Sequence, residues 1–119
     1  MGKLIMIVDD SASLRQVVGI ALKGAGYDVI EACDGKDALS KLTGQKVHLI
    51  VSDVNMPNMD GFEFVRTARG QDFGAPIIMV TTEGSEDRVR DALESGVQGY
   101  VVKPFTADDL KEALAGVGL

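Results

Sequence analysis

Residues 48–65 of the chain read HLIVSDVNMPNMDGFEFV, and this stretch contains one complete strand-to-helix unit. The apolar run Leu49–Val51 is typical of a strand that is buried on both of its faces. After a polar loop, apolar residues return at helical spacing, as in Phe62 and Val65. The stretch therefore predicts a buried strand, a loop that begins near Asp53, and a helix.

The same alternation of strand and helix patterns extends over the whole chain. Solid apolar runs lie at Leu4–Val8, Leu49–Val51, Ile77–Val80 and Tyr100–Val102. The shorter and more polar run Val29–Ile30 is typical of an edge strand. Stretches of helical periodicity follow at residues 14–22, 38–42, 62–68, 89–93 and 110–117. Because such alternation requires parallel crossover connections, we expect a doubly wound α/β fold with a five-stranded parallel sheet and helices on both faces.

The composition is typical of a single folded domain. The chain has 119 residues, of which 45% are hydrophobic and 25% are charged, so it has the size of one domain and the apolar side chains for a core. We therefore expect residues 1–119 to form one domain. The formal net charge of −6 disfavours binding to nucleic-acid phosphates or to anionic membrane surfaces.

The chain has too few cysteine and histidine residues for an internal disulfide or a zinc-binding cluster. The single cysteine, Cys33, cannot form an internal disulfide, and one histidine, His48, does not make a zinc-binding cluster. A metal ion is therefore expected to have oxygen ligands. The longest apolar run, Leu4–Val8, is too short to cross a membrane, and no signal peptide is recognisable, so we expect a cytoplasmic protein.

Residues with charged or hydroxyl-bearing side chains follow four of the predicted strands. In chain order they are Asp9, Asp10, Asp53, Thr81, Thr82 and Lys103. The first two follow the first strand, the third follows the third strand, and the rest follow the fourth and fifth strands. Ligands bind to open parallel sheets at the carboxyl ends of the strands, so we expect three acids, a hydroxyl group and an ammonium group to converge there.

Each of these residues also has a structural explanation when it is considered alone. Asp9 and Asp10 are suitable N-caps for the helix that follows them, and the helix after the fourth strand has Thr81, Thr82 and Ser85 as candidate caps. Asp53 is suited to a turn ahead of Pro57 and Asn58. Lys103 has the usual character of a solvent-exposed loop lysine. The sequence leaves these explanations open for each residue taken singly.

Convergence of the whole set favours phosphate chemistry with a metal ion. Carboxylates about 4 Å apart repel by roughly 4 kcal/mol per pair at an effective dielectric near 20, so a cation must offset them. Mg²⁺, a hard cation with oxygen ligands, meets this need. Lys103 adds a second positive centre for an anionic ligand. The set is suited to phosphoryl transfer to a carboxylate, with one aspartate as the nucleophile.

Five segments of the chain resemble the response-regulator receiver domain. They are Ile7–Asp10, Ser52–Pro57, Asn58–Gly61, Thr81 and Lys103–Phe105. Residues 55–61 and 99–106 are similar to the single-domain regulators of chemotaxis in particular. The resemblance covers the full chain and implies a flavodoxin-like fold with strand order 2-1-3-4-5. It also implies a phosphorylation-activated response regulator of a two-component system.

The resemblance assigns the phosphorylation chemistry to particular residues. It makes Asp53 the phosphoacceptor and gives Mg²⁺ four ligands, namely the carboxylates of Asp9, Asp10 and Asp53 and the backbone carbonyl group of Asn55. By the same resemblance, Lys103 pairs with the phosphoryl group. The Lys103–Pro104 peptide bond is expected to be cis, an isomer that X–Pro bonds adopt far more readily than other peptide bonds.

Further residues match positions that control the response. Thr81 matches the hydroxyl group that contacts the phosphoryl group after transfer, and Tyr100 matches the aromatic switch that turns inward when the threonine moves. Asn55 and Glu83 fall where the family tunes the lifetime of the phosphate. Outside this context, Tyr100 would be interpreted as a half-buried strand residue with its hydroxyl group in water.

The implied partners follow from the same resemblance. The phosphodonor is a histidine kinase or a small molecule such as acetyl phosphate, and a phosphatase is a further expected partner. We expect a monomer that acts as a stoichiometric phosphoacceptor, with self-phosphorylation and self-dephosphorylation activity, and not an enzyme that turns over a free substrate.

Two other classes of protein share parts of this pattern. A flavodoxin needs a loop rich in hydroxyl groups and glycine after the first strand, where this chain has Asp9 and Asp10, which would repel a phosphate. A phosphatase of the haloacid-dehalogenase type needs a second acid two residues after its nucleophile, and position 55 is Asn55. That phosphatase also needs a cap domain, for which the chain has no room.

The expected output surface departs from the pattern of motor-binding regulators. In those proteins, lysines on the face formed by the fourth helix, fifth strand and fifth helix meet an acidic segment of the flagellar switch. The matching positions here are Ser85, Glu86 and Ala113, with Lys111 nearby. Glu86 is also a favourable first-turn residue of a helix. We therefore expect weak or absent binding to the motor switch, and either another partner or a role as a phosphate sink.

Overall fold

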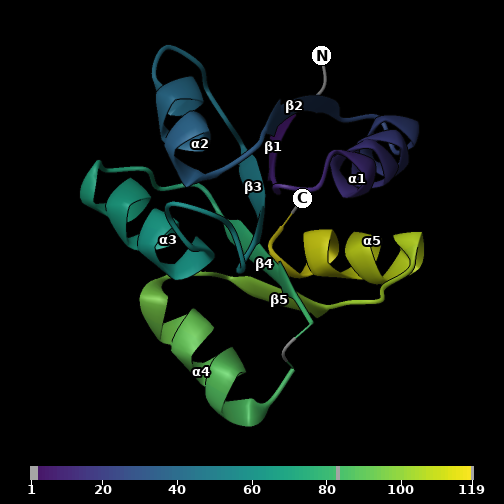
Figure 1. The fold of residues 1–119 in the computed structure, drawn as a ribbon. Coiled ribbons are helices and arrows are strands. Elements are labelled where there is room, and N and C mark those ends of the chain that lie inside the picture. The colour runs from purple at the N-terminus through teal and green to yellow at the C-terminus, as the bar shows by residue number, and fades with distance from the viewer. Residues whose placement is uncertain (1–2, 83, 119) are drawn as a thin grey trace.

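The computed structural model describes residues 3–82 and 84–118, in which strands and helices alternate (Figure 1). The strands are β1 (Leu4–Val8), β2 (Asp28–Ala32), β3 (Leu49–Asp53), β4 (Ile77–Thr81) and β5 (Gly99–Val102). The helices are α1 (Ala12–Gly24), α2 (Gly35–Leu42), α3 (Gly61–Gly70), α4 (Glu86–Ser95) and α5 (Ala107–Gly116). None of these helices is both long and apolar enough to cross a membrane.

The strands form one parallel sheet in the order β2-β1-β3-β4-β5, which confirms the expected fold class and strand order. β2 lies at one edge, as its polar character predicted, and β5 lies at the other. β2 is longer than the apolar run Val29–Ile30 because its backbone pairs with β1 over five positions, from Asp28 opposite Leu4 to Ala32 opposite Val8. Pairing of the backbone thus extends the strand into polar residues.

The central strands are buried on both faces because the pleat sends alternate side chains into two separate cores. In β1, Met6 and Val8 enter one core, and Ile5 and Ile7 enter the other. Figure 1 shows α1 and α5 over one face of the sheet and α2, α3 and α4 over the opposite face. This double covering explains why the strands appear in the sequence as continuous apolar runs.

Side-chain caps fix where the helices begin. Ser11 caps α1 by accepting the N–H of Leu14, and Ser85 caps α4 by accepting the N–H of Arg88. The N-cap of α1 is therefore a serine and not Asp9 or Asp10, one of the structural explanations considered for that acidic pair. Because Ser11 caps α1, neither carboxylate of the acidic pair is used as the cap, and both lie at the edge of the sheet.

Gly61 allows α3 to begin directly against the end of β3. Its N–H donates to the carbonyl oxygen of Val54 at 2.7 Å. A Cβ atom at position 61 would lie 2.4 Å from the carbonyl oxygen of Asp53 and 2.9 Å from the Cα atom of Val54. Both are backbone atoms that cannot move without shifting the β3 terminus, so a side chain does not fit here.

Replacement of Gly61 by alanine is predicted to destabilise the fold by about 1–3 kcal/mol, because overpacking against backbone forces the chain to move. The free energy of unfolding from urea titration measures this loss. Gly70→Ala is the matched control, since no atom lies within 4 Å of a Cβ at the other end of α3. Equal stability of the Gly61→Ala variant and the wild type would contradict the close approach.

Candidate functional site

Three carboxylates gather at the carboxyl edge of the sheet. Asp9 directly follows β1, Asp53 ends β3, and these strands are neighbours, so the topology brings both residues to the same point. One carboxylate oxygen from each of Asp9, Asp10 and Asp53 lies within 4.8 Å of the others. Asp9 and Asp53 are buried, whereas Asp10 is exposed. The set offers a cation one solvent-facing and two buried oxygen ligands, which suits Mg²⁺.

Lys103 faces two of these carboxylates from the loop after β5. Its Nζ atom lies 3.6 Å from Oδ2 of Asp9 and 3.5 Å from Oδ1 of Asp53. The backbone N–H of Lys103 donates to the carbonyl oxygen of Thr81 at 2.7 Å, which ties its loop to the end of β4. The Lys103–Pro104 bond is cis, as predicted. The lysine is therefore a part of the acidic site and not a solvated loop residue.

The burial of Asp9 carries an electrostatic cost. Desolvation raises the pKa of the Asp9 carboxyl group above its usual value, and the neighbouring carboxylates of Asp53 and Asp10 raise it further. The N–H of Ser11 and the ammonium group of Lys103 act in the opposite direction but do not cancel the rise. The site thus has an excess of negative charge, which an additional cation would relieve.

Backbone N–H donors hold the two buried carboxylates in position. The N–H of Ser11 donates to Oδ1 of Asp9 at 2.9 Å, and the N–H of Val54 donates to Oδ1 of Asp53 at 2.8 Å. Each carboxylate is thus held by the backbone that directly follows it in the chain. The orientation of both groups is therefore set before any ligand binds.

Arg15 is a supporting residue that the sequence analysis missed. From α1, its Nη1 atom donates to the backbone carbonyl oxygen of Asp9, and its Nε atom lies 3.1 Å from Oε1 of Glu31 at the end of β2. The arginine thereby fastens the loop between β1 and α1. No sequence signal identifies this contact, because it is made to a main-chain atom and depends on how the loop folds back over the helix.

The remaining predicted residues lie around this centre. Thr81 is buried at the end of β4, next to β3, and Tyr100 is half-buried one strand further out, paired with Met79. Asn55 is exposed in the loop after β3. Glu83 lies outside the described residues. The structure thus gathers the three aspartates and Lys103, with Thr81 on the strand beside them.

The chain matches the family described as the response regulator receiver domain over residues 5–115. The chain therefore belongs to the response regulator receiver domain family. This membership separates it from flavodoxins and from haloacid-dehalogenase-type phosphatases, which share only parts of the pattern. Receiver domains are phosphoacceptors of two-component signalling, with an acidic pocket for Mg²⁺, and are not enzymes in the ordinary sense.

Relatives of known identity narrow the class to chemotaxis. A protein named chemotaxis protein CheY homolog, from Campylobacter jejuni subsp. jejuni, is 43% identical over 117 residues, covering 95% of this chain and 90% of that protein. The structure of chemotaxis protein CheY4 of Vibrio cholerae is similar with a TM-score of 0.92 at 42% identity, covering 98% of this chain and 99% of that chain. A CheY-like receiver domain protein from Methanospirillum hungatei has a TM-score of 0.89 at 30% identity, covering 97% and 92% of the two chains. The chain is a receiver domain of the CheY-like chemotaxis type.

Millimolar Mg²⁺ is predicted to stabilise the fold in the absence of any phosphodonor, because a cation that binds the acidic cluster favours the folded state. At ten times the dissociation constant the gain is about 1.4 kcal/mol, or several degrees in the midpoint of thermal unfolding. Asp10→Asn should reduce this shift, whereas Asp91→Asn, an exposed position on α4, should preserve it. Coinciding midpoints of the wild type with and without Mg²⁺ would show that the cluster does not bind the metal.

Proposed function

We propose that residues 1–119 form a single receiver domain that works as a phosphorylation-activated switch of a chemotaxis-type two-component system. Asp53 is the phosphoacceptor, and a histidine kinase is the phosphodonor, with small donors such as acetyl phosphate as substitutes. The protein acts as a cytoplasmic monomer. The observation that carries this proposal is the position of Asp53, which ends β3 beside two further carboxylates and has the Lys103 ammonium group at 3.5 Å.

Phosphoryl transfer at this site needs one nucleophile and charge neutralisation. A carboxylate oxygen of Asp53 forms a new bond to phosphorus while the bond from phosphorus to the donor breaks, and the donor nitrogen or oxygen leaves with that electron pair. Asp9, Asp10, Asp53 and the backbone carbonyl group of Asn55 would hold Mg²⁺. When bound, the metal neutralises charge on the phosphoryl oxygens. Lys103, already directed at Asp53, pairs with another of these oxygens.

Activation follows from contacts that the new phosphoryl group makes. The hydroxyl group of Thr81, on the strand next to Asp53, moves to the phosphoryl group, and Tyr100 on β5 turns inward in response. The two residues then act as one two-state element whose populations phosphorylation shifts. Asn55 and Glu83 tune how long the acyl phosphate survives.

The reaction is stoichiometric, since each protein molecule accepts one phosphoryl group and does not turn over a free substrate. The protein phosphorylates itself from the donor and slowly hydrolyses its own acyl phosphate, with a separate phosphatase as a further partner. Output passes through the face formed by α4, β5 and α5. A phosphate-sink role, without motor binding, is the second candidate, because Ser85, Glu86 and Ala113 stand where motor-binding regulators carry lysines.

Acetyl phosphate with Mg²⁺ is predicted to add one phosphoryl group to the protein by intact mass. Asp53→Asn or removal of Mg²⁺ with EDTA should abolish this addition, because the nucleophile or the neutralising cation is lost. Asp60→Asn is the matched control, since an asparagine also caps α3 and the position lies in the same loop region. Undiminished labelling of the Asp53→Asn variant would refute the assignment of the phosphoacceptor.

The Thr81→Ala variant is predicted to accept a phosphoryl group on Asp53 but to transmit little of the change to Tyr100. The ring resonances of Tyr100, recorded by NMR with and without beryllofluoride, report this coupling. Thr82→Ala removes the exposed neighbouring hydroxyl group and should behave like the wild type. If the Tyr100 resonances of the wild type do not respond to beryllofluoride, no switch operates at this residue.

A further inference from the structure

A groove runs beside the outer edge of the sheet, between β5 and α5. It has a volume of about 370 Å³ and is lined by Tyr100, Val101, Val102, Asp109, Glu112 and Ala113. Because β5 is the last strand of the sheet, its outer edge is not covered by another strand of the described chain. The groove therefore combines a side-chain cavity with an open strand edge.

Part of the floor of the groove is apolar and exposed to solvent. Val102 is 41% exposed although it is a large apolar residue within a strand, and Tyr100 is half-buried beside it. Ala113 on α5 has a short side chain and leaves the groove open on that side. An apolar side chain of a partner that enters here would cover surface that is otherwise in contact with water.

Negative charge lies on the α5 side of the groove. The lining contains two carboxylates, those of Asp109 and Glu112, and no basic side chain. Asp109 is held in place because its Oδ2 atom accepts the N–H of Thr106 at 2.9 Å, in the capping box of α5. Glu86, exposed on the first turn of α4, adds a further carboxylate on the opposite side of β5.

Lys103, Arg88 and Arg90, on neighbouring elements, interact with other groups. Lys103 points at Asp9 and Asp53 in the phosphorylation site. On α4, the guanidinium group of Arg88 lies 5.1 Å from the centre of the Phe62 ring, and that of Arg90 pairs with Asp87 at 2.6 Å. Lys111 is exposed on α5 but is not among the lining residues. The groove therefore presents a negative potential to a partner.

From this complementarity we propose that the groove binds a basic segment of the output partner, in which an apolar side chain covers Val102 and flanking lysines or arginines meet Asp109 and Glu112. Like charges across an interface slow association and weaken binding, so an acidic segment is disfavoured at the same surface. The inference rests on the proposed function, because Tyr100 forms part of the groove wall and links it to the state of Asp53.

Two labelled peptides of equal length test the charge preference. Both carry a central leucine, which is flanked by lysines in one peptide and by glutamates in the other. Fluorescence polarisation with the beryllofluoride-activated protein should show binding of the lysine peptide, weakening as salt is added. Glu112→Lys should lower the affinity about tenfold, because it reverses one charge at the rim. The glutamate peptide, which has the charge of the motor switch segment, should bind more weakly than the lysine peptide.

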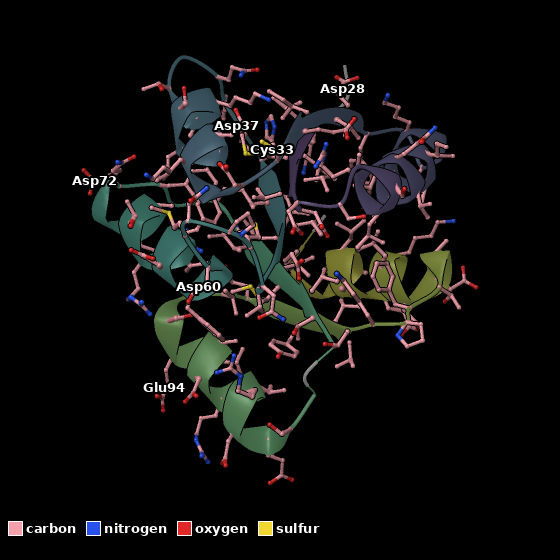
Figure 2. All side chains as sticks on the ribbon, viewed as in Figure 1. Asp28, Cys33, Asp37, Asp60, Asp72 and Glu94 are labelled. Carbon is pink, nitrogen blue, oxygen red and sulfur yellow. The ribbon has the colours of Figure 1, made fainter. Side chains whose placement is uncertain are left out.

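A matched control separates the groove from the general acidity of the chain. Glu94→Lys makes the same charge change on the outer side of α4, away from α5 (Figure 2), and should leave the affinity unchanged. Amide NMR shifts on addition of the lysine peptide should concentrate at Val102 and Glu112. Equal losses in the Glu112→Lys and Glu94→Lys variants, or tighter binding of the glutamate peptide, would overturn the proposal.

The outcomes also separate a failure of the basic-partner inference from a failure of the proposed function. If the lysine peptide fails to bind while acetyl phosphate still labels Asp53, the basic-partner inference is wrong and the proposed function stands. If the lysine peptide binds at the groove but Asp53 is not labelled, the basic-partner inference stands and the proposed function is wrong.

Discussion

The ammonium group of Lys103 between the carboxylates of Asp9 and Asp53 is the interaction on which the site depends. It joins residues from β1, β3 and the loop after β5, which are brought together only when the whole sheet has formed. One lysine opposite three carboxylates leaves the cluster negative, and burial, together with the neighbouring carboxylates, raises the pKa of Asp9. Gathering these carboxylates costs electrostatic free energy, and a bound divalent cation would lower that cost. The site therefore favours binding of a divalent cation together with an anion that the cation contacts.

The same lysine also follows the strand that belongs to the proposed output surface. Its backbone N–H binds the carbonyl oxygen of Thr81, and β5, which it follows, carries Tyr100. Under the proposed function, phosphorylation of Asp53 changes the charge next to the carboxyl end of β5. Lys103 follows the carboxyl end of β5, and residues of the same strand line the groove between β5 and α5. Short connections of this kind allow a local electrostatic change to alter a binding surface through a two-state element.

Much of this arrangement could be predicted from the sequence, for identifiable reasons. The strands appear as solid apolar runs because both of their faces are buried, and the carboxyl-end rule for parallel sheets brings Asp9, Asp53 and Lys103 together. The strand order came from the family resemblance, since periodicity does not specify which strands are neighbours. Arg15 was not predictable because it binds a main-chain atom. The groove was not predictable either, because it is lined by residues of two elements, β5 and α5, whose packing the sequence pattern does not specify.

The central claim is that Asp53, among the clustered carboxylates, receives the phosphoryl group. Borohydride reduces an aspartyl phosphate to homoserine and leaves free carboxylates intact, so it marks the acceptor chemically in the unmodified protein. Trypsin then releases residues 4–15, which contain Asp9 and Asp10, and residues 47–66, which contain Asp53 and Asp60. Fragmentation of these two peptides locates the mark. The account predicts homoserine at position 53 alone, and only after treatment with a phosphodonor and Mg²⁺. Homoserine at position 9, 10 or 60, with aspartate retained at position 53, would contradict it.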